Sequence, residues 1–156
     1  MNNKKIKVCF ISSAGGHLEQ IKQLKDVAAR YEHYYVIPKN ASTRKFAERK
    51  YLIGSFSRKE RLKFPFKFAW TAFQQFLIFL KERPDVVITT GAGVVFPTCM
   101  YAHWTRRKIV YIESFARIHS LNMTGKKLYP YANLFVVQWK ELLDIVPKAV
   151  YGGWIY

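Results

Sequence analysis

Acidic residues and cysteines are scarce in this chain of 156 residues. The sequence carries 10 Asp and Glu against 26 Lys and Arg, which gives a formal net charge of +16. The two cysteines, Cys9 and Cys99, lie inside apolar stretches without the spacing of metal ligands or of a disulfide framework. This scarcity argues against a disulfide-stabilised secreted domain and against a cysteine-ligated metal site. We therefore expect two buried, reduced thiols in a cytoplasmic protein.

Long hydrophobic helical segments are also lacking. The one candidate runs from residue 68 to residue 80 and holds 13 uncharged residues, whereas a helix needs roughly 20 residues to cross a bilayer. No signal-peptide pattern precedes the first apolar run. We therefore expect no transmembrane anchor at the N-terminus.

The excess positive charge is concentrated in one part of the chain. Between residues 39 and 67, ten basic residues face only Glu48 and Glu60. The ten are Lys39, Arg44, Lys45, Arg49, Lys50, Arg58, Lys59, Arg61, Lys63 and Lys67. Such a run is either a solvated face or a surface for nucleic acid, anionic lipid or phosphorylated substrates, and composition does not choose among these.

Apolar runs alternate with helical patterns along the whole chain. Half of the residues are hydrophobic, which is enough for one packed core. The predicted strands are residues 6–11, 34–37, 51–53, 86–89, 109–112, 134–137 and 149–151, and the predicted helices are 17–30, 42–48 (capped by Ser42), 65–81, 94–105 and 140–145. Because parallel strands need crossover helices, this order predicts one α/β domain over residues 1–156 with a doubly wound, mostly parallel sheet.

The segment from Pro65 to Lys81 has apolar residues at the spacing of an amphipathic helix. They are Phe66, Ala69, Trp70, Phe73, Phe76, Leu77 and Leu80. This helix either packs into the core or lies at a membrane surface beside its basic flank. In the second case the membrane surface comprises Arg58, Lys59, Arg61, Lys63, Lys67 and Trp70.

Two glycine-bearing turns follow predicted strands, where parallel sheets bind ligands. The first, Ser12-Ser-Ala-Gly-Gly-His17, offers Ser13 and the pair Gly15 and Gly16, which let a phosphate or sugar approach the backbone. The second offers Thr90, Gly91 and Gly93. Neither turn has the pattern of a dinucleotide-binding loop or a P-loop, so no nucleotide cofactor and no metal is expected.

Two titratable residues beside these turns are candidates for chemistry. His17 can bind a phosphate, transfer a proton or simply cap its helix. Glu113 ends an apolar strand, where a charge is costly unless it faces a cleft or meets a cation such as Arg117. A structural ion pair and a functional carboxylate both fit this pattern.

Several ordered motifs resemble one protein family across nearly the whole chain. They are Ser12-Ser-Ala-Gly-Gly-His17, Thr90-Gly-Ala-Gly93 ahead of Pro97, Tyr111-Ile-Glu-Ser-Phe-Ala-Arg117, Ser120-Leu121, Thr124-Gly-Lys126 and Leu128-Tyr-Pro-Tyr-Ala-Asn-Leu-Phe-Val-Val-Gln-Trp139. This set resembles the asparagine-linked-glycosylation subunit fourteen family, with its bacterial CpsF and PssD relatives of capsule and exopolysaccharide synthesis. That family is similar to the N-terminal half of MurG-type GT-B glycosyltransferases, which are Rossmann-like.

The resemblance implies a division of labour between two subunits. This chain would bind a polyprenyl-diphosphate-linked glycan acceptor, and a catalytic partner resembling the C-terminal half of MurG would bind the sugar nucleotide. The pair would work at the cytoplasmic face of the membrane, with this chain attached peripherally and inactive or weak alone. A single domain of 156 residues is about half of what a complete GT-B enzyme needs.

The same resemblance assigns roles to individual residues. Gly15, Gly16, His17, Gly91 and Gly93 would lie near the acceptor diphosphate. Ser114, Arg117 and Glu113 would line the cleft between the subunits, and either His17 or Glu113 would assist deprotonation of the acceptor hydroxyl. The uncharged tail would present Trp154, Ile155 and Tyr156 to the partner, although its apolar side chains could equally fold back onto the domain.

Three other functions are compatible with parts of the sequence. A stand-alone small transferase or hydrolase would use the cleft by itself, and a recruiting scaffold would need no catalytic residue. A nucleic-acid-binding module would explain the charge. The aromatic residues of this chain, however, have the spacing of core residues and are not interleaved with the basic run. We therefore expect no nucleic acid as a partner.

Overall fold

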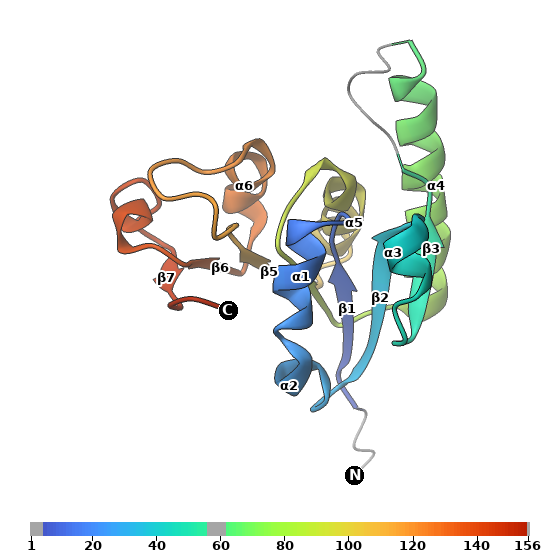
Figure 1. The fold of residues 1–156 in the computed structure, drawn as a ribbon, viewed down its shortest axis with the longest axis horizontal. Helices are drawn as coiled ribbons and strands as arrows, with labels where there is room; N and C mark the ends of the chain where they lie inside the picture. The colour runs from blue at the N-terminus through green and yellow to red at the C-terminus, as the bar shows by residue number, and fades with distance from the viewer. Residues whose placement is uncertain (1–4, 56–61, 156) are drawn as a thin grey trace.

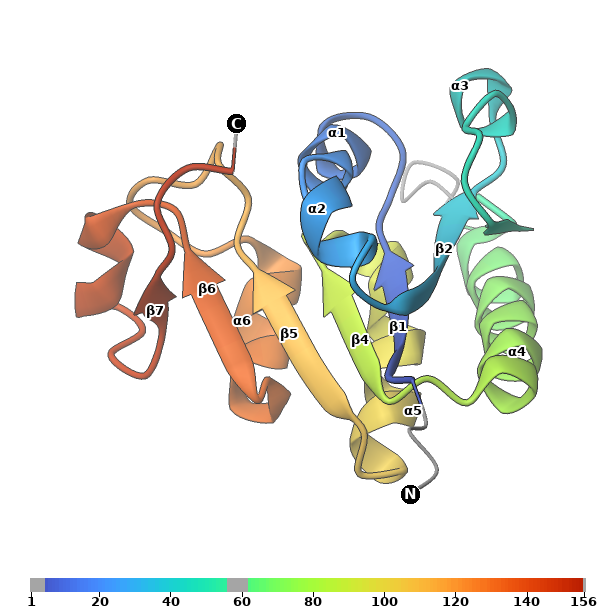
Figure 2. The ribbon, with the colours of Figure 1, turned by 90° about the horizontal axis from the view of Figure 1, so that it is seen from below.

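A computed structural model describes residues 5–55 and 62–155, without the side chains of Ala41 and Ser42. Within these residues the chain forms one sheet of seven strands in the order β3-β2-β1-β4-β5-β6-β7 (Figures 1 and 2). The strands are β1 (Lys7–Ile11), β2 (Glu32–Pro38), β3 (Lys50–Ile53), β4 (Val86–Thr89), β5 (Lys108–Ile112), β6 (Leu134–Val137) and β7 (Val150–Tyr151). The expected doubly wound α/β fold is confirmed.

Every neighbouring pair of strands in this sheet is parallel, where a mostly parallel sheet was expected. All carboxyl ends therefore lie along one edge, as Figure 2 shows. β1 and β4 pair directly, with Ile11 opposite Thr89. The strand order reverses between these two strands, so the turns that follow them lie side by side at the switch point of the sheet.

Helices cover both faces of the sheet. They are α1 (Gly16–Lys22), α2 (Lys25–Ala28), α3 (Ala41–Arg44), α4 (Phe64–Glu82), α5 (Phe96–Trp104) and α6 (Met123–Leu128), with 3-10 helices η1 (Gly93–Val95), η2 (Tyr129–Tyr131) and η3 (Lys140–Asp144). α1 and α2 cover one face, where Leu18 and Ile21 pack on Phe10 of β1. α4, α5 and α6 cover the opposite face (Figure 2).

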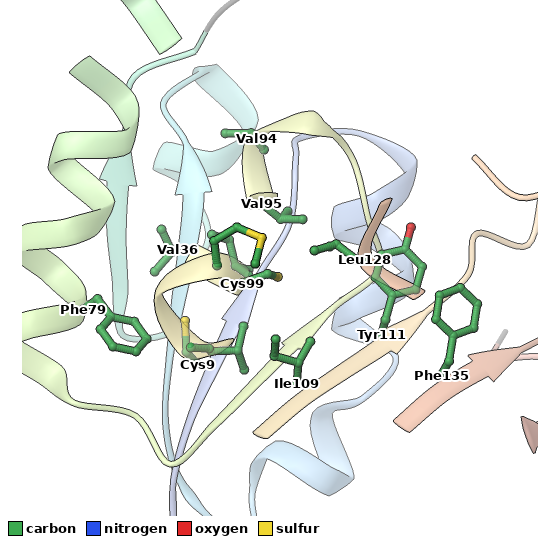
Figure 3. Packing of buried hydrophobic residues seen from close by; sticks show 14 of the residues in the cluster. Cys9, Val36, Phe79, Val94, Val95, Cys99, Ile109, Tyr111, Leu128 and Phe135 are labelled. Atoms are coloured by element: carbon green, nitrogen blue, oxygen red, sulfur yellow. The ribbon is translucent and has the colours of Figure 1, made fainter. Parts of the chain in front are cut away.

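The side chains of each strand alternate between these two faces, as the pleat requires. Cys9 and Ile11 point toward Phe79 of α4 and Cys99 of α5 (Figure 3). Burial raises the pKa of the Cys9 thiol to about 12. Cys9 and Cys99 are both free and buried, as expected from their apolar surroundings.

Four predicted helices differ from the observed ones, and the one predicted over residues 42–48 is only the four-residue α3. The helix predicted over residues 17–30 divides into α1 and α2, because Gln23 and Leu24 donate to carbonyls three residues back and tighten the turn between them. The helix predicted over 94–105 begins as η1, and the one predicted over 140–145 is the 3-10 helix η3. In each case the apolar spacing located the segment, and local hydrogen bonding decided its type.

Two capping interactions were not predicted. Asn40, not Ser42, precedes α3 as its cap, since Asn40 Oδ1 accepts from Thr43 N at 2.7 Å and Thr43 Oγ1 accepts from Asn40 N at 2.8 Å. No helix was predicted between residues 113 and 133, but this segment contains α6, whose cap Asn122 accepts from Gly125 N at 2.7 Å. α6 was missed because it has only six residues and includes a glycine.

α4 buries a different side from the one that its apolar spacing suggests. Its buried residues are Thr71, Gln75, Phe79 and Glu82, whereas most of the apolar residues that define its spacing are exposed. We call these exposed side chains the apolar stripe: Phe66, Trp70, Phe73, Phe76, Leu77 and Leu80. Of the two alternatives for this helix, packing of the stripe into the core of the chain is therefore wrong.

Polar contacts explain why this side of α4 faces inward. Glu82 forms ion pairs with Lys7 at 3.2 Å and with Arg49 at 2.7 Å, which tie the end of the helix to the start of β1. Gln75 donates to Val94 O at 3.0 Å and accepts from Thr98 Oγ1 at 2.7 Å. None of the helices in residues 5–55 and 62–155 has the length and hydropathy needed to span a bilayer.

Candidate functional site

The two glycine-bearing turns border a cavity at the carboxyl edge of the sheet. The cavity has a volume of about 360 Å³. Ser13 and Ala14 of the first turn line one side, and Ala92 and Gly93 of the second turn line another. Pro38 and Ser55, which no sequence motif singled out, complete the wall with Val94.

The first turn leaves its backbone open to solvent. Gly15 has φ of 78°, a conformation that side chains with a Cβ rarely adopt, and a Cβ at Gly15 or Gly16 would meet no atom within 4 Å. The turn therefore needs glycine at Gly15 for its conformation, and both glycines leave space above the backbone. A phosphate or sugar can approach here without displacing protein atoms.

His17 and Thr90 join the two turns. The His17 Nδ1 lies 2.8 Å from Thr90 O, and Thr90 Oγ1 donates to His17 O at 2.9 Å. Because a carbonyl oxygen only accepts, Nδ1 carries a proton and the Nε2 of the neutral ring carries the lone pair. Burial lowers the pKa of His17, although the bond to Thr90 opposes this effect. At neutral pH the imidazole is uncharged, with Nε2 able to accept a proton.

The second turn is closed on one side by the core. Gly91 has φ of 103°, and a Cβ there would lie 2.6 Å from Tyr111 Oη and 3.1 Å from Asn122 Nδ2. The expectation of an open backbone thus fits Gly15 and Gly16 but not Gly91. Gly91 allows the turn to pack against Tyr111, and Gly93 is the glycine of this turn that lines the cavity.

Glu113 is fully buried beneath the second turn and does not face the cavity. Its Oε1 accepts from Ser114 N at 2.8 Å and from Asn122 Nδ2 at 2.5 Å, and its Oε2 accepts from Asn122 N at 3.2 Å. Burial raises the pKa of Glu113 to about 7 despite these hydrogen bonds. The carboxyl group holds Asn122 and the start of α6 in place.

Arg117 does not pair with this carboxyl group. Arg117 is exposed, and the ion pairs among the described residues do not include one between it and Glu113. Its charge only favours the ionised form of Glu113 through space. The structural ion pair that the sequence allowed is therefore absent.

Two buried glutamines connect the first turn to the end of the chain. Gln20 of α1 donates to Ser114 Oγ at 3.3 Å and accepts from Phe115 N at 3.1 Å. Gln138 donates to Gln20 Oε1 at 2.9 Å and accepts from Ile155 N at 3.1 Å. The sequence analysis did not select these glutamines, because an isolated Gln carries no motif. What distinguishes them is that they are buried, and burial is known only from the folded structure.

The tail is anchored by aromatic contacts at the same edge of the sheet. Trp154 packs against Phe115 and Trp139 with ring centroids 5.6 and 5.2 Å away, and Trp139 Nε1 donates to Phe115 O at 2.7 Å. Trp154 nevertheless remains 60% exposed. Ile155 is half-buried, and Tyr156 lies outside the described residues, as do Arg58, Lys59 and Arg61.

The fold brings the predicted site residues into two neighbouring groups. Ser13 and Gly93 line the cavity, and Gly15 and Gly16 follow its lining residue Ala14. His17 and Thr90 are not among the lining residues; they join the two turns, and Thr90 is fully buried. Ser114 and Arg117 follow β5, and Ser114 accepts a hydrogen bond from Gln20 of α1, the helix that follows the first turn. Lys63, Lys67 and Trp70 lie on or next to α4, away from the first turn (Figure 1).

A family model described as "Oligosaccharide biosynthesis protein Alg14 like" matches residues 8–155. The chain belongs to this family. Among curated relatives, the UDP-N-acetylglucosamine transferase subunit ALG14 of Kluyveromyces lactis is 40% identical over 83 residues, covering 47% of this chain and 34% of that protein. The human protein of the same name is 37% identical over 79 residues, covering 47% of this chain and 37% of that protein. The matched regions thus span only about a third of these relatives.

Solved structures share the fold at low sequence identity. MurG from Acinetobacter baumannii superposes with a TM-score of 0.72 and 16% identity, over 87% of this chain and 42% of MurG. UDP-N-acetylglucosamine 2-epimerase from Rickettsia bellii superposes with a TM-score of 0.73 and 11% identity, over 97% of this chain and 45% of the epimerase. The Alg14-family chain therefore has the Rossmann-like fold of these proteins, and more than half of each has no counterpart in it.

Proposed function

We propose that this Alg14-family chain is the acceptor-binding subunit of a two-component GT-B glycosyltransferase, with a separate subunit that binds the sugar nucleotide. The observation that carries the proposal is the cavity between the two glycine-bearing turns at the switch point of the sheet. Open backbone at Gly15 and Gly16 suits a diphosphate, and nearby Ser13 and His17 offer polar side chains. The acceptor is a glycan linked to a polyprenyl diphosphate.

His17 is the better candidate for the base that deprotonates the acceptor hydroxyl. Its Nδ1 is held by Thr90, its ring is neutral at physiological pH, and it lies beside the open first turn. Both oxygens of Glu113 are already occupied, and the carboxyl group is buried. Glu113 therefore acts as a positioning residue for the second turn and α6.

The apolar stripe of α4 lies in the membrane interface. The helix has 19 residues, and its one acidic residue, Glu82, is buried in ion pairs. Lys63 and Lys67 flank the start of the stripe, and the whole chain is strongly basic. An exposed apolar row on a basic protein favours peripheral attachment to the anionic cytoplasmic face of a membrane.

The catalytic partner resembles the C-terminal half of MurG and binds UDP-N-acetylglucosamine or another UDP-sugar. The names of the curated relatives and the share of MurG that this chain covers support a subunit that needs a partner. We assign the pair to synthesis of capsule or exopolysaccharide repeat units. Trp154 and Ile155 at the carboxyl edge belong to the interface with the partner, together with Tyr156.

Reconstitution with a co-purified partner tests this function. We expect no sugar transfer by either chain alone and transfer from a UDP-sugar to a polyprenyl-diphosphate acceptor by the pair. His17→Asn keeps an amide donor for Thr90 but removes the base, so kcat should fall by about 10²- to 10⁴-fold with little change in KM. For the pair without substitutions, kcat/KM should rise with pH as His17 loses its proton. This rise should occur below the ordinary pKa of histidine.

His103→Asn is the matched control, because His103 lies exposed at the end of α5, far from the glycine-bearing turns. It should retain the full rate. Sugar transfer by the purified 156-residue chain alone would contradict the two-component proposal. A full rate for His17→Asn would remove His17 as the base while leaving acceptor binding intact.

A further inference from the structure

A second cavity adjoins the candidate site on the side of α4 and α6. It has a volume of about 260 Å³, and Gly93 lines it as well as the first cavity. Its walls come from three helices that are distant in sequence. They are formed by Phe64 and Phe68 of α4, Phe96 of α5, and Met123, Thr124 and Lys127 of α6.

The lining of this cavity is apolar with a cation at its wall. Three phenylalanine rings and a methionine surround it, and Lys127 Nζ lies 6.0 Å from the centre of the Phe96 ring. None of the described residues that line it carries a carboxylate. Such a lining favours an apolar group that is attached to an anionic head. The rings can contact the apolar group, and the ammonium group attracts the anion.

The volume limits what the cavity can hold. Pockets for drug-sized ligands have roughly 300–1,000 Å³, so a cavity of 260 Å³ suits a short branched hydrocarbon segment and not a whole lipid. A glycan would also leave its hydroxyl groups without partners against the phenylalanine rings. One or two isoprene units match both the size and the chemistry.

The position of the cavity connects the candidate site to the apolar stripe. Phe64 and Phe68 stack at 5.9 Å on the first turns of α4, the helix that carries Phe66 and Trp70 of the stripe. A chain leaving a diphosphate at Gly93 would pass these two rings before it reaches the stripe. We propose that this cavity binds the isoprene units next to the diphosphate of the acceptor, and that Lys127 pairs with the diphosphate.

This assignment rests on the proposed acceptor function and makes it specific. The prenyl chain contributes directly to recognition by this subunit and does more than hold the acceptor in the membrane. Acceptors would be selected by their first isoprene units as well as by their sugar. An anion without the hydrocarbon would bind more weakly at the same glycine-bearing turns.

Affinities of the whole 156-residue chain for three soluble probes test the assignment. The probes are inorganic pyrophosphate, dimethylallyl diphosphate and farnesyl diphosphate, measured by calorimetry below the micelle concentration. We expect farnesyl diphosphate to bind at least about tenfold more tightly than pyrophosphate, because its chain leaves water. Met123→Trp, which fills the cavity from an exposed position, should abolish this gain and leave pyrophosphate binding unchanged.

Lys127→Gln should weaken all three probes, since each carries the diphosphate. Ile145→Trp is the matched control, because Ile145 is exposed to a similar degree, 48% against 54% for Met123, and does not line the cavity. Phe64→Gln tests the opposite wall and should reproduce the effect of Met123→Trp. Circular dichroism of each variant shows that the fold is retained.

The outcomes separate this assignment from the proposed function. Equal affinity for pyrophosphate and farnesyl diphosphate would overturn the prenyl site and leave acceptor-diphosphate binding intact. If farnesyl diphosphate still bound more tightly than pyrophosphate to both Met123→Trp and Phe64→Gln, the prenyl chain would bind elsewhere. This result would also overturn the prenyl site. Failure of all three probes to bind would instead contradict the proposed function itself.

Discussion

Single residues at the candidate site differ in what their surroundings allow. His17 and Glu113 both follow or precede a turn at the carboxyl edge, and the sequence did not distinguish their roles. The fold leaves His17 half-buried beside the cavity and encloses Glu113 completely under α6. A proton acceptor must reach its substrate, so accessibility separates two residues that look equivalent in the sequence.

The pH dependence of stability should report on Glu113. The native carboxyl group titrates near pH 7, whereas its ordinary pKa is 4.5. Between these values the native state binds a proton that the unfolded chain has released, so stability falls as pH rises. The loss should be about 1.4 kcal/mol per pH unit and about 3 kcal/mol over the interval.

Urea unfolding of the original chain and of Glu113→Gln between pH 5 and pH 8 measures this effect. The amide does not titrate, so the stability advantage of the original chain should shrink as pH rises. Titration of His17 is common to both proteins and cancels in the difference. A stability difference that stays constant with pH would show that the pKa of Glu113 is not raised.

At the scale of elements, the side of α4 that is buried is not the side that its apolar spacing indicates. Its apolar residues recur with helical period, yet ion pairs and hydrogen bonds turn its polar side toward β1 and α5. Glu82 and Gln75 would be left without partners in any other orientation, which is costly for buried polar groups. The apolar stripe is consequently the side that stays exposed, which the proposed membrane attachment requires.

Substitutions on the two sides of α4 should affect different properties: vesicle binding on the exposed side and stability on the buried side. Trp70→Gln and Phe73→Gln lie on the stripe, so the free energy of unfolding should change by at most about 0.5 kcal/mol. Both should weaken flotation with anionic vesicles. Phe79→Ala, on the buried side, should leave vesicle binding of the folded protein unchanged but cost about 3–5 kcal/mol of stability.

Ile145→Gln serves as the control, since it removes an exposed apolar side chain just after η3. It should change neither stability nor flotation. Raised salt should weaken binding to anionic vesicles, because the basic flank contributes through screened charges. Equal, salt-independent binding to neutral and anionic vesicles would contradict the electrostatic part of the attachment.

At the scale of the whole molecule, the candidate site and the tail both lie along the carboxyl edge of the sheet. Gln20 and Gln138 join α1, the end of β6 and Ile155 into one buried network. The aromatic contacts of Trp154 extend this network to the surface. The tail contacts Phe115 and Trp139 at the carboxyl edge that also carries the cavity, so a partner docked on the tail would lie along this edge.

Truncation of Trp154 should reduce affinity for the catalytic partner. A half-exposed aromatic side chain held by its neighbours resembles an interface hot spot, so Trp154→Ala should cost about 2 kcal/mol, which is roughly 30-fold in Kd. Titration calorimetry with the co-purified partner measures the change. Trp104→Ala is the control, because Trp104 is also exposed but lies at the far end of α5. Unchanged affinity for Trp154→Ala and for removal of residues 154–156 would exclude the tail from the interface.

The sequence by itself determined the fold class and the position of the candidate site. Alternating apolar runs and helical patterns are local signals, and they located all seven strands and both glycine-bearing turns. The ordered motifs indicated the family that the matched model then showed. The parallel topology placed both turns at the same edge of the sheet, whereas their adjacency depends on the direct pairing of β1 with β4, which only the structure shows.

Only the tertiary structure decided which groups are buried and what they contact. The orientation of α4, the enclosure of Glu113 and the link from Gln20 to Ile155 depend on partners that are far away in sequence. The free energy of a buried polar group depends on whether its hydrogen bonds are satisfied, and those partners are brought together only when the chain folds. Periodicity gives a helix an apolar side, but the contacts of the whole chain determine which side faces the core.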